Sequence, residues 1–163
     1  MTEERRKALN LQRLPLIDVS IRANVVAVLR DLETHGLKPL IHADVWRSPA
    51  KQEELQRAGT SKVKWGFHCA TRPDGSPGSL AADIIDANKA WEATIEFWLK
   101  LGASALAQKL GWGGLWGLPV NLKDGLLEVI RRKAWNEKPK LGWDVAHIET
   151  ARVTIAEARA GKR

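Results

Sequence analysis

LAADIID, at positions 80–86, is a short and largely apolar run that is typical of a buried β-strand. Asp83 lies in the middle of this run, where a carboxylate is costly to bury unless it is ion-paired or bound to a cation. The alternative is that Asp83 ends the strand and caps a turn. Residues 80–86 therefore predict a buried strand that contains a candidate functional carboxylate.

Two helices and one strand are predicted before this run. Apolar residues recur at helical spacing over residues 20–35, which predicts an amphipathic helix. Residues 38–46 (KPLIHADVW) alternate in polarity and are rich in β-forming residues, so we expect a strand there. Ser48 and Pro49 then begin a short helix that ends at Gly59.

Two further helices and a strand are predicted after it. We expect a helix within residues 88–111, with Trp91 and Trp98 on its buried face. A second helix is expected over residues 125–135 and a last strand over residues 145–153. The irregular order of helices and strands favours an α+β fold over a regular βαβ repeat.

Length and composition fit one globular domain. The chain has 163 residues, of which 44% are hydrophobic and 28% charged, and this ordinary balance excludes wholesale disorder. No apolar run approaches the roughly 20 residues that a membrane-spanning helix needs. Cys69 is the only cysteine, so an internal disulfide and a cysteine zinc cluster are both excluded. A bound metal must therefore be held mainly by histidine and carboxylate.

The expected organisation is an N-terminal leader over residues 1–17, a domain over residues 18–153 and a basic tail over residues 154–163. Lys and Arg number 26 against 19 Asp and Glu, and part of this excess lies near the ends. The net charge of +7 favours anionic polymers, although solvated ends are the plainer explanation. Residues 1–15 show no apolar segment typical of a secretory signal, so we expect synthesis in the cytoplasm.

A group of polar residues around the last predicted strand suggests metal chemistry. Asp144 precedes His147 by three residues, and Glu149 follows it by two, on the same face of a strand. Glu149 could therefore orient the imidazole of His147. Two histidines and one carboxylate form a zinc set that leaves a fourth position open for water. A carboxylate beside such a site can act as a general base, and Asp144 is the natural candidate.

Four segments, in the same order along the chain, resemble a known family. They are WRSPAKQ (46–52), KVKWGFHCATRPDGSPGSLAADIID (62–86), GWGGLW (111–116) and GWDVAHIE (142–149). Together they resemble the zinc D-Ala-D-Ala carboxypeptidase and L-alanyl-D-glutamate endopeptidase family. That family includes vancomycin-resistance dipeptidases and many phage endolysins, and it shares its fold with the Hedgehog signalling domain. The resemblance implies one α+β domain with a small antiparallel sheet and flanking helices.

The resemblance also implies the roles of single residues. The ligands of one zinc ion per chain would be His68, Asp83 and His147. Asp144 would be the catalytic acid or base, and Arg47 would hold the scissile carbonyl or its oxyanion. Gln52 matches a polar position near the substrate cleft.

The chain departs from the family pattern in three places. Gly66 stands where a serine is more common, and the ligands His68 and Asp83 are separated by more residues than is usual. The stretch between Trp116 and Asp144 is also long. Loops that border a cleft set what fits into it, so these departures leave the substrate preference open.

Other conspicuous residues have plainer interpretations. Trp112 and Trp116 lie in a glycine-rich turn, where they could line a substrate cleft or pack in the core. Cys69 is expected to be a small buried filler. His35 and His42 are not assigned to the metal.

The leading functional prediction is a peptidoglycan hydrolase, a zinc peptidase of the endolysin type that cuts L-Ala-D-Glu bonds and acts on the cell wall after release. A D-Ala-D-Ala carboxypeptidase is the alternative within the same class. A rival from another class is a non-catalytic, basic, tryptophan-rich module that binds wall polymer or nucleic acid. The dispersed basic residues disfavour nucleic acid, and we expect a monomer that binds anionic wall polymers through its surface charge.

Overall fold

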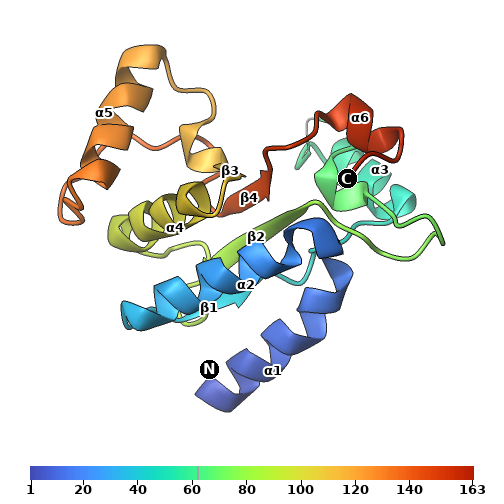
Figure 1. Ribbon diagram of the computed structural model, residues 1–163, viewed down its shortest axis with the longest axis horizontal. Helices are drawn as coiled ribbons and strands as arrows, with labels where there is room; N and C mark the ends of the chain where they lie inside the picture. The colour runs from blue at the N-terminus through green and yellow to red at the C-terminus, as the bar shows by residue number, and fades with distance from the viewer. Residues whose placement is uncertain (62) are drawn as a thin grey trace.

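Four antiparallel strands form one sheet in the order β1-β2-β4-β3 (Figure 1). The computed structural model describes residues 1–61 and 63–163, so Lys62, in the second family-like segment, lies outside the described residues. The strands are Pro39–Ile41 (β1), Ala81–Asp86 (β2), Leu110–Trp112 (β3) and His147–Thr150 (β4). The run at positions 80–86 is thus a central strand, with β1 on one side and β4 on the other.

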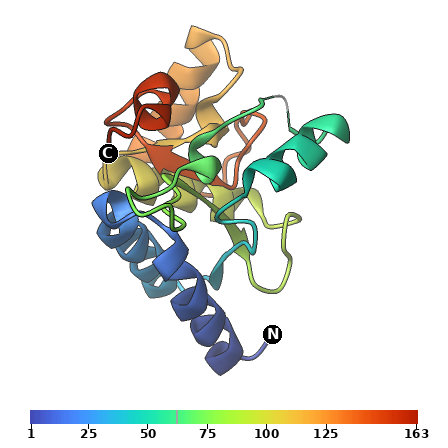
Figure 2. The ribbon, with the colours of Figure 1, turned by 90° about the vertical axis from the view of Figure 1, so that its right-hand side faces the viewer.

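Six α-helices and three short 3-10 helices of the described residues surround the sheet. The α-helices are Glu3–Arg13 (α1), Val19–Thr34 (α2), Pro49–Arg57 (α3), Ile95–Ala107 (α4), Val120–Arg131 (α5) and Ile155–Arg159 (α6). The 3-10 helices are Leu14–Leu16 (η1), Phe67–Cys69 (η2) and Gly113–Leu115 (η3). Helix α2 packs on α4 and β1, whereas α3 lies apart from α1 and α2 in both ribbon views (Figure 2).

The alternation of side chains along the two central strands separates the core from the cleft. Ala82 and Ile84 of β2 and Ile148 of β4 belong to the main hydrophobic core. Their neighbours Asp83 and His147 point to the opposite face of the sheet, because successive residues of a strand face opposite ways. Asp83 and His147 therefore lie on the face of the sheet that is turned away from the main hydrophobic core.

Polar caps explain where three of the helices begin. Asp18, Ser48 and Thr94 each accept a hydrogen bond from a backbone N–H in the first turn of α2, α3 and α4, respectively. The first two of these helices begin within a residue of their predicted starts.

The predicted helix within residues 88–111 begins later than expected. The Asp86 carboxylate accepts hydrogen bonds from the backbone N–H groups of Asn88 and Lys89, which makes a turn in place of a first helical turn. Trp91 consequently precedes α4 and is 52% exposed, so its prediction as a core residue is wrong. Trp98 is buried as predicted.

Other elements differ from the predictions in length. The strand expected over residues 38–46 is limited to β1, because the chain turns at residues 43–44. The helix expected over residues 125–135 is α5, which begins directly after Pro119, and β4 is shorter than predicted. Each difference moves an end of an element and leaves its type unchanged.

Both terminal segments are folded onto the sheet and its helices. Arg6 of α1 is 2% exposed, and its guanidinium donates to the carboxylates of Glu3 and Glu33 at 2.6 Å and to the carbonyl of Pro39 at 2.8 Å. Helix α6 begins with a capping box at Thr154 and buries Ala158. Residues 1–17 and 154–163 therefore contribute to the packed structure. None of the described helices is long and apolar enough to span a membrane.

Trp112 of β3 packs against α4 at a glycine. A Cβ atom built on Gly102 would lie 2.4 Å from the Trp112 ring, which is closer than real Cβ contacts allow. The glycine thus creates the space that a fully buried indole occupies.

We expect Gly102→Ala to destabilise the protein by about 1–3 kcal/mol, because overpacking against Trp112 outweighs the gain in helix propensity. Gly125→Ala is the matched control, since Gly125 also lies in a helix but has nothing within 4 Å of the added Cβ. The control should stabilise the protein by about 0.5–1 kcal/mol. Urea unfolding of the two variants measures both effects, and equal shifts in one direction would contradict this packing account.

Candidate metal centre

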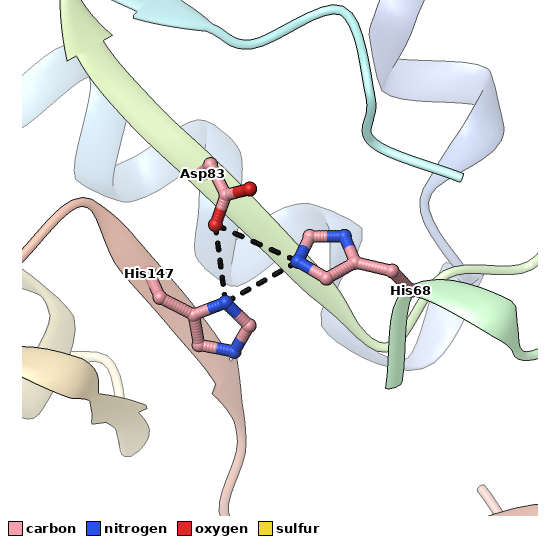
Figure 3. A group of neighbouring side chains, drawn as sticks. All are labelled: His68, Asp83 and His147. Carbon is pink, nitrogen blue, oxygen red and sulfur yellow. Dashed lines mark hydrogen bonds and ion pairs between the residues drawn. The ribbon is translucent and has the colours of Figure 1, made fainter. Parts of the chain in front are cut away.

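Three buried side chains point toward one another on the cleft face of the sheet (Figure 3). The Nδ1 atom of His147 lies 3.1 Å from Oδ1 of Asp83 and 3.2 Å from Nε2 of His68. The Nε2 atom of His68 lies 3.5 Å from the same Asp83 oxygen. Residues from η2, β2 and β4 thus bring one potential ligand atom each to a common point.

The sheet register positions two of these residues. Asp83 and His147 are direct partners across the antiparallel pair β2 and β4. Side chains of directly opposed residues on one face lie close together, so the pairing alone brings the carboxylate to the imidazole. His68 is brought to them by backbone hydrogen bonds on each side of it: Leu80 donates to the carbonyl of Phe67, and Arg47 donates to the carbonyl of His68.

Hydrogen bonds behind the two imidazoles fix which nitrogen faces the centre as an electron-pair donor. Nδ1 of His68 lies 2.8 Å from the carbonyl oxygen of Val45, which can only accept, so Nδ1 carries the proton. In the same way, Nε2 of His147 lies 3.0 Å from a carboxylate oxygen of Glu149 and carries the proton there. When each ring is neutral, the nitrogen that converges with Asp83 is therefore the one with a lone pair.

The spacing of these donors fits a tetrahedral metal ion. Zinc bonds of about 2.0–2.1 Å at tetrahedral angles separate neighbouring ligand atoms by about 3.3 Å. The three observed separations, from 3.1 to 3.5 Å, bracket this value. Two imidazole nitrogens and one carboxylate oxygen are also ligand types that zinc prefers. His68, Asp83 and His147 can therefore hold a metal ion, and their chemistry fits zinc.

The electrostatics of the cluster favour a cation at its centre. Burial opposes charge on Asp83, but the His68 and His147 side chains outweigh it and keep the pKa of Asp83 well below its usual range. Burial likewise opposes protonation of His147, yet hydrogen bonds to Asp83 and Glu149 raise the pKa of His147 to about 9. The two carboxylates thus attract positive charge to this imidazole, whether proton or metal ion.

Arg47 and Asp144 border the cluster. A guanidinium nitrogen of Arg47 lies 3.3 Å from the outer oxygen of Asp83, and both Arg47 and Asp144 line the same cleft. Burial raises the pKa of Asp144, and its backbone packs closely on Gly113. A Cβ atom on Gly113 would lie 2.2 Å from the Asp144 carbonyl, so only glycine allows this contact.

The cleft has a volume of about 680 Å³ and contains every predicted site residue except Trp112. Gln52 is buried in its wall and donates to Ser61 and to the carbonyl of Val63, which ties α3 to the following loop. Trp116 lines the cleft with its ring centroid 4.9 Å from that of His147. Trp112 is instead 1% exposed and donates its indole N–H to the carbonyl of Val145. Of its two predicted positions, in the cleft or in the core, it therefore occupies the core.

The sequence interpretation missed several residues of the cleft. Trp143, Trp91, His42 and Asp44 all line it. Trp143 directly precedes the predicted base Asp144, and this adjacency was a signal that could have identified it. No comparable signal marks His42 and Asp44, because they lie in a segment whose alternation predicted a strand.

We expect the chelator-treated protein to bind one zinc ion per chain, measured by calorimetry and by metal analysis. Zinc at about 100 times its dissociation constant should stabilise the fold by about 2.7 kcal/mol and raise the melting temperature by about 5–10 °C. His147→Ala should abolish this shift, since it removes one of the three donors. His42→Ala, which removes a histidine of the same cleft outside the cluster, should retain it. An undiminished shift in His147→Ala would refute this ligand set.

Comparison with known proteins supports the fold. A scan against protein-family models gave no match, and neither did a search of curated proteins. Among solved structures, the chain is similar to the L-Ala D-Glu endopeptidase ChiX of Serratia marcescens, with 16% sequence identity and a TM-score of 0.54. The similarity covers 88% of this chain and 87% of that chain. The predicted α+β architecture is thus confirmed: the chain has a ChiX-like fold, with a buried His–Asp–His group that can hold a metal ion.

Proposed function

We propose that this chain is a zinc-dependent peptidoglycan peptidase that hydrolyses the bond between L-alanine and D-glutamate in the stem peptide. The convergence of the ligand atoms of His68, Asp83 and His147 in a cleft carries this proposal. The choice of bond is supported by the named activity of ChiX, whose fold the chain shares. We further propose that it acts on the cell wall as an endolysin, where its net charge of +7 favours contact with anionic polymers.

Each residue of the cluster has a defined task in this proposal. His68, Asp83 and His147 would hold the ion, while Val45 and Glu149 keep the two rings in the required orientation. What zinc supplies in such a site is Lewis acidity, which polarises a carbonyl group and makes water easier to deprotonate.

Arg47 and Asp144 would carry out the remaining steps. The Arg47 guanidinium, beside Asp83 in the cleft, stabilises the negative charge that develops on the scissile carbonyl oxygen. The Asp144 carboxylate accepts a proton from the attacking water and returns it to the leaving amine of D-glutamate. Hydrolysis then needs no covalent link between enzyme and substrate.

Digestion of purified peptidoglycan tests the proposed reaction. We expect new amino groups on D-glutamate, identified by mass spectrometry, in the presence of zinc and none in the presence of a chelator. New amino groups on D-alanine would instead support the D-Ala-D-Ala carboxypeptidase alternative. If no bond of the peptidoglycan is cut in the presence of zinc, the result would support the rival prediction of a non-catalytic binding module.

We expect Asp144→Asn to retain zinc and to lose about 10²–10⁴-fold in turnover, because proton transfer by a positioned carboxylate contributes that much. Asp44→Asn is the matched control, since it removes another carboxylate that lines the cleft, and it should keep most of the turnover. The rate of amide hydrolysis and the zinc content of each variant are the measurements. Turnover of Asp144→Asn at the parent rate would show that another group is the base.

A further inference from the structure

Two aromatic pairs flank the metal centre, one toward each edge of the sheet. Trp116 follows β3 and η3 and lies 5.1 Å from Trp143, measured between ring centroids. His42 follows β1 and lies 5.2 Å from Trp91. Because β1 and β3 are the two edge strands, the pairs lie on either side of the ligands carried by β2 and β4. All four rings line the cleft.

The pair Trp116 and Trp143, here called the indole platform, continues directly from the metal centre. The His147 and Trp116 ring centroids are 4.9 Å apart, so two consecutive ring contacts lead from a metal ligand to Trp143. Trp143 is 64% exposed, which is unusual for a residue of its size beside a buried cluster. The proposed reaction gives the platform no role.

Close packing at glycines brings the two indoles together from two segments that are distant in sequence. A Cβ atom on Gly142 would lie 2.5 Å from the Trp116 carbonyl, and one on Gly117 would lie 2.9 Å from the Trp143 ring. Gly142 also donates its N–H to the carbonyl of Gly114. The two indoles are therefore held by close backbone packing of residues 113–117 against residues 142–144, the segment that ends in Asp144.

The chemistry of the platform suits a sugar ring. An indole offers a large apolar face, and the face of a pyranose ring offers C–H groups that can stack on it. The side chains next to the proposed scissile bond are a methyl group and a carboxylate, and neither has a comparable flat surface. In the cell wall, the L-alanine of the stem is joined through a lactyl group to the sugar N-acetylmuramic acid.

The distances along the substrate fit the position of the platform. One residue and the lactyl group separate the L-Ala-D-Glu bond from the sugar, a span of roughly 7 Å at 3.3–3.6 Å per unit. The sugar would be about 17 Å from a D-Ala-D-Ala bond on the same scale. The two ring contacts, of 4.9 and 5.1 Å, place the Trp143 ring within about 10 Å of the His147 ring, which is closer to the shorter span than to the longer one.

We propose that the indole platform binds the muramic acid ring next to the scissile bond, so that the enzyme favours glycan-linked stem peptides over free ones. This inference rests on the proposed function, because it assumes cleavage of the L-Ala-D-Glu bond. Trp143 then determines specificity and takes no part in the proton transfers.

The test compares two probes that differ only in the sugar: N-acetylmuramoyl tetrapeptide and the corresponding N-lactoyl tetrapeptide. We expect kcat/KM for the muramoyl probe to be about three- to tenfold higher, the size of one aromatic stacking contact. Trp143→Ala should bring this ratio close to one, and Trp143→Phe should leave it intermediate. Muramoyl tetrapeptide reduced with borohydride, whose sugar ring is open, should react like the lactoyl probe.

Trp91→Ala is the matched control, because Trp91 is also an exposed indole of the cleft but belongs to the other aromatic pair. It should keep the ratio of the parent protein. A kcat/KM ratio of one between the two probes in the parent protein would refute sugar binding by the indole platform. So would a ratio that falls in Trp91→Ala and not in Trp143→Ala. Neither result would contradict the proposed function. If neither probe is cleaved at the L-Ala-D-Glu bond, the proposed function fails and the platform with it.

Discussion

The burial of three electron-pair donors at one point is the constraint on which the rest of the structure depends. His68, Asp83 and His147 are each about 5–6% exposed, and hydrogen bonds behind both rings turn the nitrogens that carry a lone pair in the neutral rings toward the same carboxylate oxygen. Such a group is repulsive unless a proton or a metal ion joins it, and burial of unpaired polar atoms is costly. The β2–β4 register, the position of η2 and the Glu149 contact all serve this one arrangement.

The sequence predicted much of the fold and of the site because both depend on local patterns. Strand LAADIID, the helices after Asp18 and Ser48, and the convergence of His68, Asp83 and His147 were all accessible from periodicity, capping and family-like segments. The missed features have one local and one tertiary cause. Trp91 has the spacing of a core residue but is displaced by a local turn, in which the Asp86 carboxylate accepts hydrogen bonds from Asn88 and Lys89. Trp112 is buried where Gly102 and Gly114 leave room for its ring, and the spacing of apolar residues does not reveal that contact.

The N-terminal segment shows the same limit of local reasoning. Its mixed charges resemble a solvated leader, yet Arg6 is buried between carboxylates of Glu3 and Glu33 and a carbonyl of β1. A buried arginine is tolerated only where its donors are satisfied, and the partners come from three places in the chain. The charge balance of a short segment therefore does not reveal whether it is packed.

The contact between residues 113–117 and 142–144 has a consequence for evolution and for protein engineering. It joins the two ends of the excursion that contains α5, so this excursion begins and returns at one fixed point beside Asp144. Its exposed residues can then diverge with little disturbance to the candidate metal centre, whereas Leu126 and Val129 of α5 are buried in the main core and must stay apolar. Exchange of the exposed segments on either side of α5 is accordingly a route to a changed surface that leaves the cluster of His68, Asp83 and His147 in place.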